Sequence, residues 1–334
     1  MTGNRQIIIA SLPAGQLAAT DYELRDGDVP EPGDGEVLVR TLALTIGAGQ
    51  RAGLQGSASY AGAPTTGIVM PGTGVGRVEV SKIDGVEPGQ IVVGMTGWQD
   101  HAVLGAREAR VVDADVDPAL HLSLFGTNGL TAYFGLFEVG RPAAGETVVV
   151  SAASGSVGHL VGQLAAAQGC RVVGVTGSDD KGARLVDELG FDTFVNHRAG
   201  DFRDAFKAAT AEGIDVYFDN TGGDILGAAL RRMRPHGRIV CCGVVSQYDT
   251  DTPEPGPRGV PGLLVNNRVR MEGFLVFDFA DRYDQARADL RARLEAGTIV
   301  SLHDEIDGLQ HAPAAFVDLL GGGNIGTRII RVAD

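Results

Sequence analysis

The chain has 334 residues, which is enough for two domains with a sizeable core. Its 28 basic and 42 acidic residues give a formal net charge of −14, which repels a phosphate backbone, so nucleic acid is not an expected partner. A hydrophobic fraction of 44% excludes a disordered chain. The 49 glycines are about 15% of the residues, roughly twice the usual share, but no Gly-X-Y period is present and collagen is excluded.

The chain contains three cysteines, Cys170, Cys241 and Cys242. Their number and spacing provide neither a disulfide framework nor a four-cysteine metal site, so we expect a reduced, intracellular protein. We expect Cys241 and Cys242 to be small buried side chains. The N-terminal apolar run, residues 7–10, is too short for a signal peptide, and no 18-residue apolar stretch occurs. A soluble cytoplasmic protein with no membrane partner is therefore expected.

The first third of the chain is predicted to be β-rich. Short alternating segments at 36–41, 74–80 and 90–94 are separated by Pro-Gly and Asp-Gly turns. This pattern is typical of a small barrel-like antiparallel domain.

From about Asn128 onward, strand-like runs alternate with helix-length segments, which predicts βαβ units and a doubly wound parallel sheet. The stretch 248–266 is interpreted as a surface loop because it holds four prolines, and residues 269–277 as a further strand. The tail from residue 319 is predicted to form turn and strand and to return to the first domain. The predicted strands are 147–152, 171–175, 193–195, 215–219 and 238–242, and the predicted helices are 157–168, 181–189, 201–210 and 224–232.

The strongest motif runs from Glu146 to Gly162 (ETVVVSAASGSVGHLVG). It joins a buried-strand run, a glycine turn and the start of a helix, which is the context that makes a glycine fingerprint specific for a dinucleotide. Gly155 allows a tight turn close to a pyrophosphate, and Gly158 allows the helix to pack closely on the strand. The helix N-terminus provides N–H donors and a positive dipole for the phosphates.

The end of the second strand distinguishes NAD from NADP. An NAD-binding chain usually carries Asp or Glu there to bind the ribose hydroxyls, whereas this chain has Thr176, Gly177 and Ser178. Small residues leave room for a 2′-phosphate, and Lys181, together with Arg184, can offset its charge. Asp179 and Asp180 argue the other way, but they fall in the first turn of the next helix, where acids are ordinary. NADP(H) is therefore the predicted cofactor.

Four segments together resemble the zinc-independent medium-chain dehydrogenase/reductase superfamily: 130–136 (LTAYFGL), 152–158 (AASGSVG), 216–223 (VYFDNTGG) and 242–248 (CGVVSQY). Within it they resemble the leukotriene B4 dehydrogenase/prostaglandin reductase branch, to which bacterial NADPH-dependent curcumin reductases belong. The resemblance covers nearly the whole chain. It implies a GroES-like domain of residues 1–125 and 300–334 and an inserted NADP-binding Rossmann domain of residues 126–299.

The resemblance also implies functional residues. His197 stands where the family usually has a tyrosine near the adenosine phosphate, and Tyr248 matches the family tyrosine near the nicotinamide. On the substrate side Gly47, Arg51, Tyr60 and Asn128 are candidates. The predicted cofactor-binding residues are Gly155, Ser156, Val157, Gly158, Gly177, Lys181, His197, Asn220, Cys242, Gly243, Val244, Ser246, Tyr248, Phe274, Leu275, Val276 and Asn324.

No metal ligand set is expected, because the seven histidines are scattered and no cysteine cluster supports them. Without a metal to polarise a carbonyl, the residues favour hydride addition to an activated C=C bond, with charge spreading to a carbonyl oxygen. Tyr248 is the candidate catalytic residue, because it follows the fifth strand of the predicted sheet, where ligands bind in open α/β folds. The predicted enzyme is an NADPH-dependent ene-reductase acting on α,β-unsaturated ketones or aldehydes.

The substrate-side motifs depart from the family. Residues 44–51 read LTIGAGQR where the family commonly has LSLDPYMR, and residues 127–129 read TNG where it usually has MPG. These changes leave two alternatives open. One is a reductase of quinones or of a specialised biosynthetic intermediate, and the other is an NADPH-binding protein with a regulatory or cyclase-like role without net redox. Homodimerisation is expected from the family, with residues 269–277 as a candidate edge strand.

Overall fold

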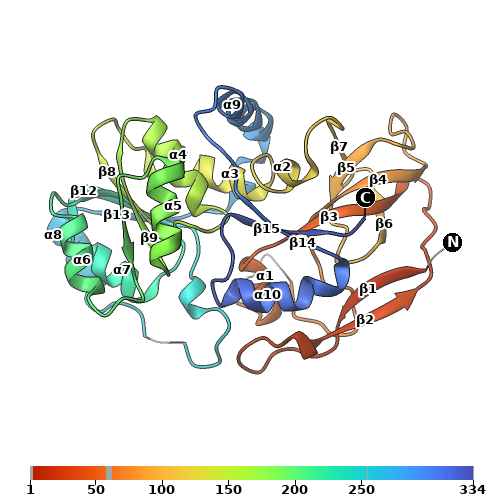
Figure 1. The fold of residues 1–334 in the computed structure, drawn as a ribbon, viewed down its shortest axis with the longest axis horizontal. Coiled ribbons are helices and arrows are strands. Elements are labelled where there is room, and N and C mark those ends of the chain that lie inside the picture. The colour runs from red at the N-terminus through yellow and green to blue at the C-terminus, as the bar shows by residue number, and fades with distance from the viewer. Residues whose placement is uncertain (1–2, 58–61, 254, 334) are drawn as a thin grey trace. The chain divides into compact units, whose positions relative to one another are not determined.

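The computed structural model describes residues 3–57, 62–253 and 255–333, and their chain divides into two compact units (Figure 1). Unit 1 comprises residues 1–126, 249–251 and 303–334, and unit 2 comprises residues 127–248 and 252–302. The family-based limits at 125/126 and 299/300 remain a prediction. Within the described residues, none of the helices combines the length and the apolar character that crossing a bilayer requires.

Unit 1 is built around one mainly antiparallel sheet. Its strand order is β14-β15-β3-β4-β5-β7, with β6 paired to β3, and a separate hairpin is formed by β1 (Asn4–Ile9) and β2 (Tyr22–Gly27). The C-terminal strand β15 pairs antiparallel with β3, so the tail belongs to the same sheet as the N-terminal strands. The strands are β3 (Glu36–Ile46), β4 (Gly74–Ser81), β5 (Ile91–Gly94), β6 (His101–Gly105), β7 (Arg110–Val112), β14 (His303–Asp307) and β15 (Thr327–Arg331).

The largest core of unit 1 lies under short helices that cover part of this sheet. Trp98 is fully buried there, stacks on Tyr22 with ring centroids 5.6 Å apart and meets Phe316 edge-on at 5.9 Å. Such aromatic pairs add to the stabilisation from apolar burial. The helices are α1 (Gly49–Leu54), α2 (Pro118–Leu122) and α10 (Ala312–Leu320), with 3₁₀ turns η1 (Ala19–Asp21) and η6 (Leu309–His311).

Unit 2 contains a six-stranded, fully parallel sheet with the order β10-β9-β8-β11-β12-β13. This is the doubly wound order, in which the chain leaves β8 toward one edge and later returns to build the other half from β11. Every residue of β8 and β11 is buried, which explains their near-continuous apolar sequences. The strands are β8 (Thr147–Ser151), β9 (Arg171–Thr176), β10 (Thr193–Asn196), β11 (Ile214–Asp219), β12 (Met233–Cys241) and β13 (Arg270–Gly273).

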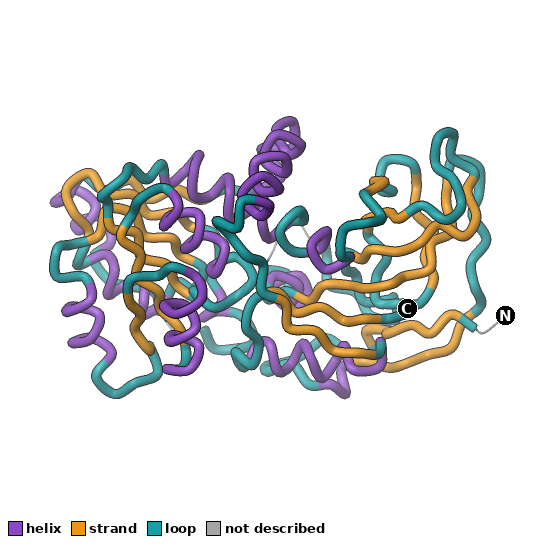
Figure 2. The backbone as a smooth tube through the Cα atoms, turned by 45° about the horizontal axis from the view of Figure 1, so that its top comes forward, coloured by secondary structure: helices purple, strands orange, loops and turns teal. Residues whose placement is uncertain are grey.

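Helices alternate with these strands along the chain (purple and orange in Figure 2). The predicted fold class, a β-rich GroES-like domain plus a doubly wound Rossmann domain, is confirmed. The helices of unit 2 are α3 (Thr127–Phe134), α4 (Gly158–Ala167), α5 (Asp179–Leu189), α6 (Phe202–Ala209), α7 (Gly223–Leu230), α8 (Val260–Asn267) and α9 (Tyr283–Glu295), with a π-helical turn η3 (Gly135–Gly140) and 3₁₀ turns η4 (Val245–Gln247) and η5 (Val276–Arg282).

Two sequence-based expectations for unit 2 are wrong in part. The stretch 248–266 is not all loop, because α8 begins at Val260, and Pro261 fits its first turn, where no backbone N–H is needed. The strand expected over 269–277 ends at Gly273. The chain then forms the turn η5 instead of an extended strand. Within this turn, Phe279 stacks on Phe134 with ring centroids 4.7 Å apart.

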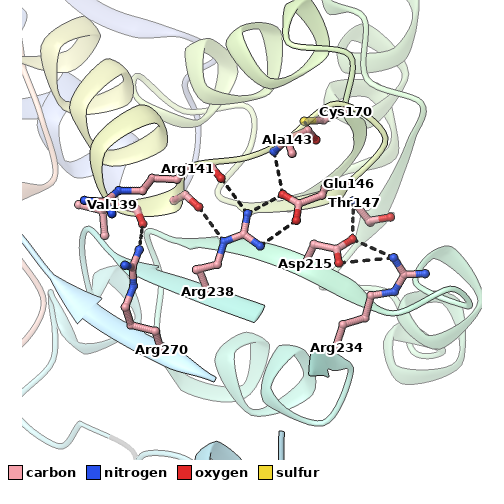
Figure 3. A network of polar contacts seen from close by, with 11 residues as sticks. Val139, Arg141, Ala143, Glu146, Thr147, Cys170, Asp215, Arg234, Arg238 and Arg270 are labelled. Carbon is pink, nitrogen blue, oxygen red and sulfur yellow. Dashed lines mark hydrogen bonds and ion pairs between the residues drawn. The ribbon is translucent and has the colours of Figure 1, made fainter. Parts of the chain in front are cut away.

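Ion pairs fasten the amino ends of the central strands of unit 2 (Figure 3). Arg238 pairs with Glu146, whose Oε2 also accepts a hydrogen bond from the Ala143 amide at 2.8 Å. Asp215 accepts from the Thr147 amide at 2.9 Å and pairs with Arg234 at 3.1 Å. The acids of these pairs lie at the start of β8 and β11, at the opposite end of the sheet from the carboxyl ends of the strands.

Candidate functional site

The predicted cofactor residues of unit 2 gather at the carboxyl ends of neighbouring strands. The glycine turn follows β8, Gly177 follows β9, Asn220 follows β11, and residues 242–248 follow β12. Because β9, β8, β11 and β12 are adjacent and parallel, these four segments lie along one edge of the sheet. The edge includes the switch point between β8 and β11, which is where doubly wound sheets bind ligands.

The glycine turn between β8 and α4 is compact. The Gly155 amide donates to the Ala152 carbonyl at 2.9 Å, and the Ser154 and Thr176 hydroxyls are 2.8 Å apart, which joins the turn to the end of β9. A Cβ on Gly158 would lie 2.3 Å from the Ala152 carbonyl oxygen, so only glycine fits at the start of α4. The turn therefore brings the N-terminus of a ten-residue helix close to the strand end, as an anion-binding turn requires.

His159, in the first turn of α4, holds this glycine turn in place. Its side chain is fully buried, its Nε2 accepts a hydrogen bond from the Leu302 amide at 3.2 Å, and its Nδ1 lies 2.8 Å from the Gly155 carbonyl oxygen. Because Nε2 accepts, Nδ1 carries the proton and donates to Gly155. This histidine was not predicted as a site residue, although a polar residue after Gly158 in an apolar helix is a signal that could have identified it.

The small residues Gly177 and Ser178 follow β9, where the sequence predicts a site for a 2′-phosphate. The Ser178 side chain caps α5 by accepting from the Lys181 amide. A Cβ on Gly177 would lie 3.4 Å from both His197 Nε2 and Arg198 Nε. Arg198 therefore lies beside the predicted residues and was missed, because a basic residue in a turn after a strand carries no specific sequence signal.

The acids near this turn, Asp179 and Asp180, begin α5. Asp179 Oδ1 accepts a hydrogen bond from the side-chain Nδ2 of Asn196 at 3.0 Å, and both acids lie in the first turn of α5, as expected. Arg184, expected to assist Lys181, instead forms two 2.8 Å hydrogen bonds with Glu188 one helical turn later. Among the helix residues considered for the phosphate, Lys181 remains the candidate.

His197 is exposed, but burial of part of its ring lowers its pKa, and the neighbouring Arg198 guanidinium lowers it further. The neutral imidazole is thus favoured at neutral pH in the free protein. An anion bound beside it would favour the charged form instead.

The turn after β11 is organised by Asp219, a residue that was not predicted. Its Oδ1 accepts hydrogen bonds from the Tyr217 hydroxyl at 2.9 Å, the Gly222 amide at 2.9 Å and the Thr221 amide at 3.1 Å. Burial raises the pKa of this carboxyl, while these hydrogen bonds act in the opposite direction. The neighbouring Asn220 donates from its side chain to the Ser151 carbonyl at 2.7 Å, so the turn is fixed to the end of β8.

The segment 242–248 is fastened to the same turn by its backbone. The amides of Cys242 and Gly243 donate to the Asp219 carbonyl, the Val245 amide donates to Asn220, and the Ser246 amide donates to Thr221. Cys241 and Cys242 are partly accessible rather than fully buried as expected. Burial and the nearby Asp219 raise the pKa of the Cys241 thiol to about 11 and that of Cys242 to about 12, so neither is a thiolate at neutral pH.

The remaining predicted residues of unit 2 follow β13 or lie on α3. A Cβ on Gly135 would lie 2.6 Å from the Phe274 ring, so Phe274 packs on that glycine. The Val276 carbonyl accepts from the Tyr283 hydroxyl at 3.0 Å, and Leu275 is exposed. Asn128 lies in the first turn of α3.

Four predicted residues belong to the segments of unit 1. The Gly47 amide donates to Gln50 Oε1 at 2.9 Å, and a Cβ on Gly47 would meet no atom within 4 Å. Arg51 is 1% exposed, and the Asn324 side chain donates to the Gly326 carbonyl at 2.8 Å. Tyr60 lies outside the described residues.

Across the part of the chain that the structure describes, no three His, Cys, Asp or Glu side chains are grouped so that they could hold a metal ion.

Comparison with known proteins shows the class of protein to which this chain belongs. Two family models match: "N-terminal domain of oxidoreductase" over residues 5–112 and "Zinc-binding dehydrogenase" over residues 156–291. A relative named NADPH-dependent curcumin reductase, from Escherichia coli, is 36% identical over 335 residues, covering 99% of this chain and 97% of its own. The NADP(+)-dependent 2-alkenal reductase of Nicotiana tabacum is 37% identical over 340 residues, with 99% and 98% covered.

Among solved structures, that of CurA from Vibrio vulnificus in complex with NADPH matches with a TM-score of 0.94 and 36% identity, covering 99% of both chains. The chain belongs to the medium-chain dehydrogenase/reductase superfamily, in the curcumin reductase/prostaglandin reductase branch, as its motifs indicate.

Proposed function

We propose that this protein is an NADPH-dependent reductase that adds hydride to the C=C bond of α,β-unsaturated ketones or aldehydes. The observation that carries the proposal is the carboxyl edge of the parallel sheet, where a tight glycine turn and a basic, acid-free strand end occur together. The relatives named NADPH-dependent curcumin reductase and 2-alkenal reductase, which match nearly the whole chain, support the same reaction class.

The residues of this edge fit NADPH. The close approach of Gly158 to Ala152 leaves the first turn of α4 open to a pyrophosphate, whose charge the helix N-terminus favours. His197 and Arg198 beside Gly177, together with Lys181 in the first turn of α5, would provide the charge that a 2′-phosphate needs. Asn220, fixed by its bond to Ser151, and the backbone-anchored segment 242–248 would hold the rest of the cofactor.

The bound nicotinamide would supply the hydride, and the protein must stabilise the charge that develops on the substrate. Addition at the β-carbon places negative charge on the carbonyl oxygen, and a hydrogen-bond donor aimed at that oxygen lowers the barrier. We assign this donor to the Tyr248 hydroxyl, because the segment that carries it is bonded to the turn after β11. The phenol would donate a hydrogen bond to that oxygen, and a proton from water at the α-carbon would complete the reduction to the saturated carbonyl compound.

The test is NADPH oxidation, followed by absorbance, with a panel of alkenals, enones, quinones and saturated ketones. We expect turnover of alkenals and enones, no reduction of saturated ketones, and a saturated carbonyl compound as the product. Exclusive turnover of quinones would replace the proposed acceptor class. Tight NADPH binding without turnover of any acceptor would exclude a reductase and favour the non-redox alternative.

A further inference from the structure

Arg51 in α1 is a buried charge in unit 1. Only 1% of its side chain is exposed, yet its Nε donates to Asp249 Oδ1 at 3.0 Å and its Nη2 donates to the Gly15 carbonyl at 2.6 Å. The same Oδ1 of Asp249 also accepts a hydrogen bond from the Leu17 amide at 2.5 Å. The pair therefore joins α1, the loop before η1 and residue 249 into one polar cluster.

A contribution to stability does not by itself explain this cluster. Among the described residues, Nη1 of Arg51 has no hydrogen-bond partner, although it is buried. An unsatisfied buried donor is unfavourable, and a buried ion pair is often no more stabilising than apolar side chains of similar volume. A role beyond stability is therefore a reasonable explanation for a buried arginine at this position.

The place of Asp249 in the chain suggests that role. Residues 249–251 belong to unit 1, whereas Tyr248 and Thr252 on either side of them belong to unit 2. Asp249 adopts a left-handed backbone conformation with φ of 59°, which Asp tolerates better than most residues. On the other side, the Tyr248 amide donates to the Val245 carbonyl at 3.1 Å. The backbone of Tyr248 is thus fixed both at its own amide and directly after it.

We propose that the Arg51–Asp249 pair is a positioning device that holds the backbone of Tyr248, and so restricts where its hydroxyl can lie. The inference rests on the proposed function, in which Tyr248 donates to the substrate oxygen. It makes Arg51 a positioning residue rather than a group that touches substrate, in keeping with its burial. Small displacements of a reacting group can cost about 100-fold in rate, so such a constraint has a kinetic effect.

The main test replaces both partners, in the double variant Arg51→Met with Asp249→Ala, because removing one partner alone would leave a buried unpaired charge. We expect kcat with an enone to fall by about tenfold or more. The dissociation constant for NADPH, measured by fluorescence, should stay within about twofold, because the glycine turn before α4 and the basic residues near Gly177, which we propose to hold the cofactor phosphates, are untouched. The single variant Asp249→Asn keeps Oδ1 as a hydrogen-bond acceptor for Arg51 and the tolerance of a left-handed backbone, so it should retain most of the turnover although the negative charge is lost.

Two controls separate positioning from general destabilisation. The double variant Arg328→Met with Asp304→Ala removes another buried pair of unit 1, in which Arg328 is 4% exposed, and should leave kcat unchanged. In a Tyr248→Phe background, loss of the Arg51–Asp249 pair should cost less than about twofold more, because the effect acts through the missing hydroxyl. If the main double variant does not fold, Arg51→Lys, which retains the charge but cannot reproduce the planar fork, replaces it with a smaller expected loss of kcat.

The outcomes distinguish the two proposals. If enones are reduced and Tyr248→Phe slows the reaction, but loss of the pair leaves kcat unchanged or acts fully in the Tyr248→Phe background, the positioning role is wrong and the proposed function stands. If enones are reduced and Tyr248→Phe leaves kcat unchanged, the role of Tyr248 and the positioning role that depends on it are both wrong. Absence of enone turnover in the unmodified protein would overturn the proposed function itself, and the positioning role with it.

Discussion

Lys181 is the side chain on α5 that we expect to distinguish NADPH from NADH. It lies in the first helical turn after Gly177, and no acid occupies the end of β9. Loss of a charge-assisted contact to the 2′-phosphate should raise the dissociation constant for NADPH by about tenfold in Lys181→Ala. The dissociation constant for NADH should stay nearly the same, because that cofactor has no 2′-phosphate.

Arg184 provides the matched control on the same helix. Its guanidinium is bonded to Glu188, so Arg184→Ala removes one positive charge of α5 without removing the proposed contact. Its effect on NADPH binding should be much smaller than that of Lys181→Ala. Equal weakening by the two variants would show that general charge, rather than a specific contact, determines the preference. Both constants can be measured by fluorescence titration at one ionic strength.

His197 should make NADPH affinity depend on pH. Partial burial and Arg198 lower the pKa of its imidazole, so it is mostly neutral at pH 8 and gains a proton as the pH falls. The charged ring attracts the 2′-phosphate, and the phosphate in turn raises the pKa of the ring. Affinity for NADPH should therefore increase by about threefold or more between pH 8 and pH 5.5, as expected for a charge gained beside the phosphate.

The phosphate also titrates in this range, so the contribution of the histidine is the difference from a His197→Tyr variant. That variant keeps an aromatic ring and removes the titration, and its NADPH affinity should change less with pH. NADH binding should be independent of pH in both proteins. Identical pH profiles for NADPH would show that the ring does not face the phosphate.

The residues that sequence reasoning missed share a physical cause. His159 and Arg198 act through contacts with other segments, Leu302 for His159 and Gly177 for Arg198, and the Asp219 carboxylate also accepts a hydrogen bond at 3.3 Å from the Ser151 hydroxyl on β8. Such contacts exist only once the strands are ordered side by side. The glycine turn and Lys181 could be identified because their signal is local, in a strand, a turn and a helix that are consecutive in the chain.

At the scale of elements, local patterning predicted the central strands well and the chain after β12 poorly. The valine-rich runs of β8 and β9 are buried and strand-forming, and nothing competes with that interpretation. Prolines between 248 and 266 suggested a loop, but one of them fits the first turn of α8. Residues 274–277 form a short continuous apolar run typical of a strand, yet the structure has the turn η5 from Val276, with Phe279 packed on Phe134.

The ion pair between Glu146 and Arg238 should contribute to the acid stability of unit 2 (Figure 3). The Arg238 hydrogen bond lowers the pKa of Glu146, and the Ala143 amide acts in the same direction although burial opposes it. A carboxyl whose pKa is lower in the folded than in the unfolded state stabilises the fold above its ordinary pKa. This stability is lost as the pH falls below about 4.5 and through the lowered value.

Glu146→Gln should lower the free energy of unfolding at pH 7 by about 1–2 kcal/mol, because the pair is largely but not fully buried. Urea unfolding from pH 3 to pH 7 should show a weaker pH dependence in the variant. Glu188→Gln, in the exposed pair with Arg184, is the matched control and should change the stability less. Equal losses of unfolding free energy in both variants would mean that burial of the Arg238–Glu146 pair adds nothing to stability.

At the scale of the molecule, the return of the C-terminal tail could be predicted, whereas the return of residues 249–251 to unit 1 could not. The tail carries a strand pattern long enough to pair with β3. The three residues after Tyr248 have no such pattern, and Asp249 is bonded to Arg51, which lies 198 residues away in the chain, and to the Leu17 amide. Pairwise contacts of this kind leave no periodic trace in the sequence.

We expect the molecule to associate into a homodimer through the edge of unit 2 formed by β13. This strand ends the parallel sheet, and three large apolar residues close to it in the chain are exposed: Val265 before it by 73%, and Leu275 and Phe277 after it by 42% and 57%. An open strand edge beside large exposed apolar groups is a common pairing surface.

Light scattering after gel filtration should give twice the 34.7 kDa of one chain. Phe277→Asp should shift the protein to the monomer, because a dimer would bury the introduced charge. Val111→Asp, on the edge strand β7 of the other sheet where Val111 is 42% exposed, is the matched control and should leave the mass unchanged. A monomeric unmodified protein, or dissociation by the control alone, would place the association surface elsewhere or remove it.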